Sequence, residues 1–582
     1  MTAAARSGVR DAGRFRLVDR AWEIEAAPDV MVRLKRIFPR CASTFTGAIR
    51  LAATPEMAAE LAWVLMRWPM AASPADRSAL QAAADEHAHA EALVQQILAG
   101  AAPLQAHPDW VRSTVALREY QRQARDLVWA NGGTLAVHDL GAGKTLTSLA
   151  LLENPDARPA VAVTLSGRMP KQWRKQLAKF YPDLTCLELQ NGDKQALEVD
   201  GRLPDLITMN YHKLAKWQHE LKAVARTVIF DEVHELRRRD SDKYAAARTV
   251  AANATYVMGL SGTPIYNYGA EAYHVIDAVR PGALGSQEEF ARQWCGTTSL
   301  TPKTLVQDMN SLQAHLQAQG LMHRVDYDTA GLPRPRCNVI QQFVPSDPDI
   351  LEELQGNAVE MAQLILDQAT DPREKFALAG ELDWRLRQAT GIAKAAFVAD
   401  FVKLLLDGGR DKVLLFGWHI EVYRMWAELL GQYRPRFYTG GQNAAAKDQA
   451  IDDFIDGDAR LLIMSLRSGA GIDGLQDVCH TAVIGELDWS PGVHTQGIGR
   501  VCRPGQPEDV DAFFCVTDAG ADPFMLETLD IKTLQAQTFL NPDTPIGDPD
   551  PLERQAQRNR IKALAADFVA RASATTASGG PS

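Results

Sequence analysis

A glycine-rich loop lies between an apolar run and a helical segment in the first third of the chain. The run TLAVHDL precedes the loop and LTSLALL follows it, and the loop itself consists of Gly141, Ala142, Gly143, Lys144 and Thr145. Glycines allow backbone N–H groups to close around phosphate oxygens where a helix begins. In such a loop Lys144 reaches the β- and γ-phosphates of a nucleotide, and the Thr145 hydroxyl ligates Mg²⁺. The sequence therefore predicts a site for ATP and Mg²⁺.

The loop is a shortened variant of the strict phosphate-binding pattern, because His138 stands where that pattern has glycine. A tight turn between a strand and a helix, with no ligand, is the alternative explanation of the loop taken alone. Two further groups of polar residues favour the nucleotide site.

The first group is an acidic pair. The apolar run TVIF ends at Asp231 and Glu232, and a carboxylate at the end of such a strand lies beside a phosphate-binding loop. We expect Asp231 to hold Mg²⁺, and Glu232 to orient and deprotonate the attacking water. Two solvated acids at the end of a strand are the alternative for this segment alone.

The second group lies far downstream, in the segment HTQGIGRVCRPGQ. Gln496, Arg500 and Arg503 recur at i, i+4 and i+7, which is the spacing of one helix face. A guanidinium fork suits the charge that develops on a transferring phosphoryl group. We expect Arg500 and Arg503 to act as arginine fingers, and Gln496 to touch the γ-phosphate or the attacking water. A solvated basic helix face is the alternative.

The elements around these residues alternate between short apolar runs and polar helical stretches. The alternation covers about Leu117 to Arg280 and again Lys412 to Thr517, and it predicts parallel sheets covered by helices, an α/β fold. Between them the chain is rich in Gln, Glu, Ala and Leu, which favours helices. The predicted units are 1–112 (N-terminal accessory domain), 113–280 (first lobe, ATP-binding), 281–395 (helical insertions and linker), 396–545 (second lobe) and 546–582 (tail, partly disordered).

In their fixed order, several short motifs resemble those of the Swi/Snf-type ATPases of helicase superfamily two. The first-lobe motifs are LREYQRQA, VTLSGRMPKQWRKQL, NYHKL, DEVH and SGTP, and the second-lobe motifs are SLRSGAGIDGLQ and ELDWSPGVHTQGIGRVCRPGQ. The resemblance covers about Leu117 to Leu540. It implies two RecA-like lobes with helical insertions that hydrolyse ATP and move on duplex or branched DNA. Part of the linker pattern is matched by Arg324, Asp326, Leu332 and Pro333.

The resemblance also implies roles for residues that the chemistry alone does not assign. Gln121 would read adenine, and Trp173, Asn210 and Tyr211 take positions of the family's motifs. His234, Ser261 and Thr263 would couple nucleotide state to movement of the lobes. In the second lobe the matching residues are Gly469, Gly471 and Asp473. Asp473, which we expect near the nucleotide, stands where the family has asparagine.

The N-terminal section is the least specific part of the sequence. From Met31 to Pro55 it has several arginines and lysines and no acid, which favours a nucleic-acid contact. The run containing Leu34, Lys35, Ile37 and Pro39 resembles the HARP-type module of fork-remodelling translocases. A plain α/β accessory domain is the alternative.

Composition limits the classes of protein that remain. The chain has 582 residues, of which 46% are hydrophobic. Its net charge of −10 argues against a protein that passively coats nucleic acid, because such proteins are usually basic. The seven cysteines form no C-x-x-C pair, and no apolar run is long enough for a membrane span or a secretory signal. We therefore expect a monomer in a bacterial or host cytoplasm. An RNA helicase and a nucleotide-controlled scaffold without turnover remain as alternative functions.

Overall fold

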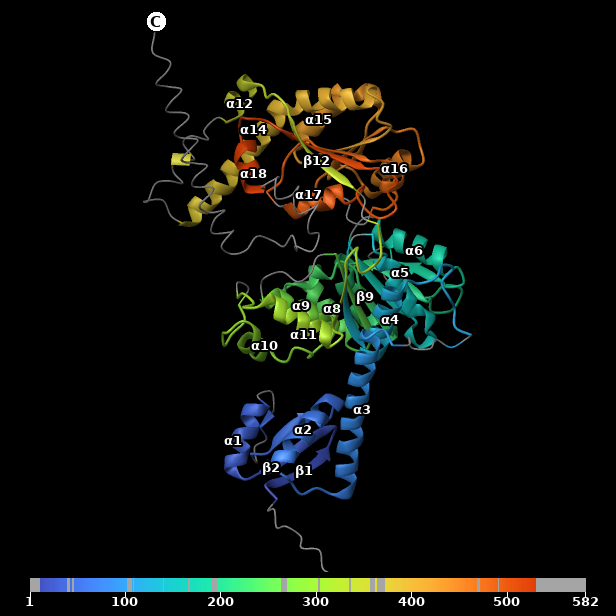
Figure 1. Ribbon diagram of the computed structural model, residues 1–582, viewed down its shortest axis with the longest axis vertical. Coiled ribbons are helices and arrows are strands. Elements are labelled where there is room, and N and C mark those ends of the chain that lie inside the picture. The colour runs from blue at the N-terminus through green and yellow to red at the C-terminus, as the bar shows by residue number, and fades with distance from the viewer. Residues whose placement is uncertain are drawn as a thin grey trace, which may run out of the picture.

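The computed structural model describes most of residues 11–529 (Figure 1). The gaps within that range are 39–41, 44–46, 102–106, 108, 140, 166–167, 190–195, 263–268, 302–303, 334–335, 356–361, 364–371, 468–471 and 490. Thr263, Gly469, Gly471 and the tail 546–582 therefore lie outside the described residues, and so do the predictions made for them. No helix in the described part is long and apolar enough to cross a membrane.

The N-terminal section folds around a small antiparallel sheet in the order β1-β2-β4-β3. Its strands are β1 (Gly13–Val18), β2 (Ala21–Ala26), β3 (Ala42–Ser43) and β4 (Ile49–Ala52). Asp19 and Arg20, both with positive φ, form the two-residue turn between β1 and β2. Alternate residues, among them Phe15, Trp22 and Ile49, are buried. They pack with helices α1 (Pro28–Ile37) and α2 (Pro55–Arg67) in one core.

A long helix, α3 (Pro74–Leu98), leads from this sheet to the first lobe (Figure 1). Ser73 caps its N-terminus and Pro74 occupies its first turn, which is a favoured helix start. At the other end Val94 and Ile97 pack against Leu127 of the first lobe. The helix α3 thus connects the cores of the N-terminal section and the first lobe.

The first lobe has a parallel sheet of seven strands in the order β11-β5-β10-β9-β6-β8-β7. The strands are β5 (Gly133–His138), β6 (Ala160–Thr164), β7 (Cys186–Glu188), β8 (Leu206–Asn210), β9 (Thr227–Phe230), β10 (Tyr256–Ser261) and β11 (Met322–Val325). The helices are α4 (Glu119–Asn131), α5 (Lys144–Leu149), α6 (Met169–Phe180), α7 (Tyr211–Val224), α8 (Asp242–Ala251), α9 (Gly269–Val279), α10 (Gln287–Trp294) and α11 (Met309–Ala318). The central strands are buried along their whole length, as expected for a parallel sheet covered on both faces.

The second lobe has a parallel sheet of six strands in the order β12-β17-β16-β13-β15-β14. The strands are β12 (Cys337–Phe343), β13 (Val413–Gly417), β14 (Arg436–Tyr438), β15 (Leu461–Ser465), β16 (Thr481–Ile484) and β17 (Val510–Val516). The helices are α12 (Pro348–Gln355), α14 (Pro372–Asp407), α15 (Ile420–Leu429), α16 (Ala444–Ile455), α17 (Pro491–Ile498) and α18 (Asp522–Leu529). The predicted α/β fold, with two parallel-sheet lobes and a small N-terminal domain, is confirmed.

The interval 281–395 contains helices, as expected, namely α10, α11, α12 and the first part of α14, and it also contains two strands. It contributes β11 to the first sheet, beside β5, and β12 to the second sheet, beside β17. In β11 the polar residues His323 and Arg324 interrupt the apolar pattern. The edge strand β12 has exposed side chains at Gln341 and Phe343. Because β11 has only four residues and β12 is polar at three of its seven positions, their sequence does not separate them from loops.

A buried ion pair fixes the last helix of the second lobe to its longest one. Lys394 of α14 donates from Nζ to Asp522 Oδ2 at 2.6 Å and to the Cys515 carbonyl at 2.8 Å. The two charged side chains are 1% and 4% exposed. Each charge therefore depends on the other for its solvation.

Replacing Lys394 by methionine is expected to destabilise the second lobe by about 3–5 kcal/mol, because Asp522 becomes a buried charge without a counterion. Urea unfolding of the full chain, followed by hydrogen exchange in peptides of α14 and α18, measures the change. The double variant Lys394→Met with Asp522→Asn should regain most of the loss, because the amide is neutral. A single variant as stable as the wild type would contradict the prediction.

Candidate nucleotide site between the lobes

The glycine-rich loop leaves the carboxyl end of β5 and enters α5, as the sequence predicts. Gly141 and Gly143 have φ of 80° and 75°, in the left-handed region that side chains disfavour. A Cβ built on Gly141 would lie 2.6 Å from Cδ of Pro504 in the second lobe. Glycine at this position thus allows the two lobes to approach each other at the loop.

Lys144 lies at the end of the loop and is partly buried. Its ammonium donates to the His138 and Asp139 carbonyls at 2.8 and 3.2 Å. Burial lowers the pKa of Lys144, against the opposing influence of Glu232, Asp231 and Asp139, and the positive charge of Arg503 lowers it further. The predicted acids and one predicted arginine therefore lie within electrostatic reach of the loop lysine.

Asp231 follows directly after β9 and is nearly buried. Trp173 of α6 donates from Nε1 to its Oδ2 at 3.1 Å, and the Tyr211 hydroxyl donates to its backbone carbonyl at 2.9 Å. Burial and the neighbouring Glu232 raise the pKa of Asp231 to about 6, while Trp173 opposes the rise. A cation bound here would relieve this repulsion, and the Thr145 hydroxyl and Asp231 carboxylate are oxygen ligands of the kind that Mg²⁺ prefers.

Glu232 adopts a left-handed backbone, with φ of 50° and ψ of 55°. Such a conformation at a non-glycine residue is strained and is concentrated at functional sites. Its carboxylate lies 3.3 Å from Nδ1 of His234, in the 3-10 turn Val233–Leu236. Burial alone would raise the pKa of Glu232, but His234 and the charge of Lys144 bring it below its ordinary value. Glu232 therefore stays ionised and can accept a proton.

The segment LREYQRQA, which precedes β5 in the sequence, contacts the phosphate-binding loop through Tyr120 and Gln121. Gln121 is 3% exposed, and its Oε1 accepts from the Arg118 backbone N–H at 2.9 Å at the start of α4. Its Nε2 would lie 2.8 Å from a Cβ on Gly143. Its predicted contact with adenine stays a prediction. Sequence reasoning missed Tyr120, whose hydroxyl donates to the Ala142 carbonyl at 2.7 Å, although it belongs to the recognised LREYQRQA segment.

The predicted helix face of Gln496, Arg500 and Arg503 is wrong. Helix α17 ends at Ile498, so Gln496 lies on it and both arginines lie beyond it. Gly497 and Gly499 weaken the helix here, and the backbone continues in tight turns from Arg500 N–H to the Gly497 carbonyl and from Val501 N–H to the Ile498 carbonyl.

The two arginines consequently have different surroundings. Arg503 donates to the Ile472 carbonyl at 2.6 Å and to Asp473 Oδ1 at 3.4 Å, and its Cβ faces Gly141. Arg500 is buried, and this burial together with the charge of Arg503 lowers its pKa to about 10, against the influence of Tyr438. Of the two arginines, Arg503 is the one that the described residues place against the phosphate-binding loop. Asp473, which we expected near the nucleotide, holds Arg503.

Ser261 ends β10, the strand between β5 and β9, and is 3% exposed. His234 touches Glu232, so two of the three residues that we expected to couple nucleotide state to movement lie beside the site. Across the lobes, Arg168 at the start of α6 pairs with Asp448 at 3.1 Å and Asp452 at 2.6 Å, both on α16. The roles of these residues stay predictions.

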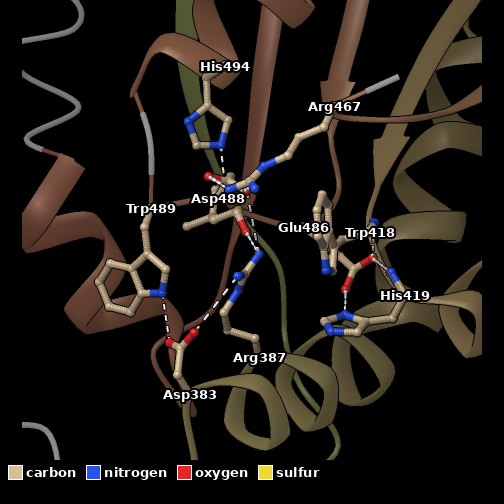
Figure 2. A network of polar contacts seen from close by, with 10 residues as sticks. Asp383, Arg387, Trp418, His419, Arg467, Glu486, Asp488, Trp489 and His494 are labelled. Carbon is tan, nitrogen blue, oxygen red and sulfur yellow. Dashed lines mark hydrogen bonds and ion pairs between the residues drawn. The ribbon is translucent and has the colours of Figure 1, made fainter. Parts of the chain in front are cut away.

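The second-lobe motif ELDWSP organises a buried polar network at the carboxyl ends of β13, β15 and β16 (Figure 2). Asp488 is fully buried and pairs with Arg467 at 3.0 Å, while Trp489 donates to Asp383 at 2.7 Å. The guanidinium carbons of Arg467 and Arg387 lie 4.9 and 5.7 Å from the centre of the Trp418 ring. The network leaves the Arg467 side chain 54% exposed, next to an aromatic ring.

Comparison with known proteins finds one matching family model and several similar proteins. Residues 59–343 match the model of the SNF2-related domain. A mouse protein named DNA annealing helicase and endonuclease ZRANB3 is 24% identical over 429 residues, which cover 71% of this chain and 39% of the mouse protein. An uncharacterized ATP-dependent helicase of Bacillus subtilis, YqhH, is 24% identical over 443 residues, covering 69% of this chain and 74% of that protein.

A Xenopus tropicalis protein, SWI/SNF-related matrix-associated actin-dependent regulator of chromatin subfamily A-like protein 1, is 25% identical over 70% of this chain and 43% of its own length. The match thus spans about two fifths of the mouse and frog proteins. Among solved structures, the Sulfolobus solfataricus SWI2/SNF2 ATPase core in complex with dsDNA covers 75% of this chain and 95% of that chain, at 18% identity and a TM-score of 0.35.

Proposed function

We propose that the chain is an ATP-dependent DNA translocase or helicase, which moves along or remodels duplex or branched DNA, because residues 59–343 match the model of the SNF2-related domain. One observation carries the proposal: Arg503 of the second lobe lies against Gly141 of the phosphate-binding loop in the first. A nucleotide in that loop would touch both lobes, so its hydrolysis would change how they are held together.

The hydrolytic step assigns a role to each side chain at the loop. Lys144 binds the β- and γ-phosphate oxygens, and Arg503 stabilises the charge that develops on the transferring phosphoryl group. Glu232, ionised and held by His234, orients the attacking water and accepts its proton. Thr145 and Asp231 would hold Mg²⁺, which neutralises charge on the phosphate oxygens. Trp173 orients Asp231 through its hydrogen bond.

Movement follows from the loss of one of these contacts. While ATP is bound, Lys144 and Arg503 hold one phosphate chain from opposite sides. After hydrolysis the second lobe loses that anchor, and the equilibrium between closed and open lobes shifts. Nucleic acid lying across both lobes would then be moved by one step per cycle.

DNA is the favoured partner because the mouse relative is named a DNA annealing helicase. The exposed Arg467 beside the Trp418 ring is a surface suited to a phosphate backbone, since guanidinium groups bind phosphate oxygens and aromatic rings stack on bases. An RNA helicase is the alternative. Because lysine, acids and arginine all come from one chain, we propose a monomer. We also propose a bacterial or host cytoplasm as the location; in the part of the chain that the structure describes, no disulfide joins two cysteines.

The proposed activity is tested by ATPase assays with duplex DNA, single strands, forks and RNA at one fixed salt concentration. Duplex or forked DNA is expected to stimulate hydrolysis most, and the stimulation should fall as salt rises, because phosphate contacts release counterions. Stimulation by RNA alone would favour the alternative. Wild-type protein that hydrolyses no ATP with any nucleic acid would overturn the proposal.

A further inference from the structure

His138, which replaces a glycine of the strict loop pattern, belongs to a chain of buried hydrogen bonds. It is the last residue of β5, and its Nε2 lies 3.0 Å from Nδ1 of His323 on β11. Nε2 of His323 lies 2.9 Å from Oε1 of Gln123 on α4. Gln123 Nε2 donates to the carbonyls of Ile97 and Leu98, the last turn of α3, at 2.8 and 3.3 Å.

The direction of every bond in this chain is fixed by its outer end. Because the Gln123 amide nitrogen faces two carbonyl oxygens, its oxygen must face His323 and accept from it. His323 therefore carries a proton on Nε2, and Nδ1 of the neutral ring is an acceptor. His138 must then donate from Nε2. The two rings thus have assigned tautomers, each neutral.

Their surroundings agree with neutral rings. Burial, the neighbouring His323 and the charge of Lys144 hold the pKa of His138 well below its ordinary value, and burial lowers the pKa of His323 to about 4. A proton added to Nδ1 of His323 would place two N–H donors against each other at 3.0 Å. Among the residues that the structure describes, no partner reaches Nδ1 of His138, which is 0% exposed.

The inner end of the chain reaches the nucleotide loop. The His138 carbonyl accepts the 2.8 Å bond from Lys144 Nζ, and the His138 ring packs edge-on against Tyr120 with centroids 5.7 Å apart. Tyr120 in turn holds the Ala142 carbonyl of the loop. A shift of the His138 ring would therefore move an acceptor of the loop lysine and one support of the loop.

We propose that Gln123, His323 and His138 form a relay of positioning residues that sets the place of Lys144 and links the last turn of α3 to the nucleotide loop. The inference rests on the proposed function of the loop. Through α3 the relay joins the N-terminal sheet to the ATP site. A mechanical force on the N-terminal domain would therefore change the affinity of the site for ATP.

Two isosteric variants of His323 separate the halves of the relay. In His323→Asn the amide oxygen takes the place of Nδ1 and can accept from His138, while in His323→Gln the amide nitrogen takes the place of Nε2 and can donate only toward Gln123. Asparagine keeps the bond to His138 but loses the bond to Gln123, so it should raise KM for ATP severalfold, to the same extent as Gln123→Leu and less than glutamine or alanine. Glutamine and alanine should raise KM about five- to tenfold, the effect of one or two lost hydrogen bonds. Binding of a fluorescent ATP analogue should rank the affinities of these variants in the same order, and it requires no turnover.

A second pair of variants tests the link to α3. Gln123→Leu touches no atom of the loop, yet it removes the outer anchor and should raise KM for ATP severalfold. Gln95→Ala is the matched control, since Gln95 bonds α3 to the Ala318 carbonyl at 2.7 Å outside the relay, and it should leave KM unchanged. Thermal unfolding of each variant separates positioning from loss of folded protein.

Equal ATP affinity in the asparagine and glutamine variants, or a wild-type KM in Gln123→Leu, would overturn the relay while leaving the proposed function intact. Wild-type protein without any ATPase activity would instead refute the proposed function, and binding of the analogue would still test the relay. If His323→Ala does not fold, the two isosteres and Gln123→Leu give the answer.

Discussion

ATP hydrolysis is expected to fall by at least about 100-fold when Lys144 is replaced by alanine, because the variant loses the cation placed at the developing phosphate charge. In the structure this ammonium lies within the field of Asp231, Glu232 and Arg503. Release of inorganic phosphate, measured with and without saturating duplex DNA, checks the result. Affinity for ATP should also weaken.

Glu232→Gln is the matched comparison for that variant. It should lose turnover to a similar degree while keeping ATP binding, since the amide neither accepts a proton nor removes a phosphate contact. Unchanged hydrolysis in both Lys144→Ala and Glu232→Gln would place the active site elsewhere in the chain. The folded state of each variant is checked by its thermal unfolding.

Replacing Arg503 by alanine is expected to lower kcat by about 10³-fold, the usual contribution of an arginine finger, with ATP binding largely retained. Arg503 comes from the second lobe and faces Gly141, so it acts only when the lobes are closed. Single-turnover hydrolysis gives the rate of the chemical step, and equilibrium binding of an ATP analogue gives the affinity. A lost affinity with an unchanged rate would contradict the assignment.

Three further variants define this role. Asp473→Asn should cause a smaller loss than Arg503→Ala, because the amide oxygen can still accept from the guanidinium. Arg500→Lys should act mainly on stability, since Arg500 is buried. Arg436→Ala, which removes an exposed pair with Asp453 in the same lobe, is the control and should leave the rate unchanged.

Much of the site follows from local sequence. The loop between β5 and α5 could be predicted because its strand, glycines and helix follow one another directly in the sequence. The acids after β9 could be predicted in the same way, because they directly follow an apolar run. The order of the motifs also predicted two α/β lobes, because buried parallel strands appear as uninterrupted apolar runs. The placement of Thr145, Gln121 and Ser261 near the loop agrees with that order, although their roles stay predictions.

Other features depend on contacts between distant segments, and the sequence carries no local signal for them. Strands β11 and β12 are recognised only by pairing with β5 and β17, since β11 has four residues and both strands are partly polar. Trp173 of α6 donates a hydrogen bond to Asp231, which follows β9. Arg503 donates to Asp473, and this bond depends on the turn of the chain after α17.

The chemistry of the site could be predicted from residue type and order alone, because these are enough to recognise a lysine loop, an acid pair and arginines. Which arginine faces the loop, and which residues His138 contacts, depends on the folded arrangement of distant segments. Helical spacing placed Arg500 and Arg503 on one face, but glycines ended α17 before either of them. His138 departed from the pattern in sequence, and its partners His323 and Gln123 come from β11 and α4, so only folding brings the three together.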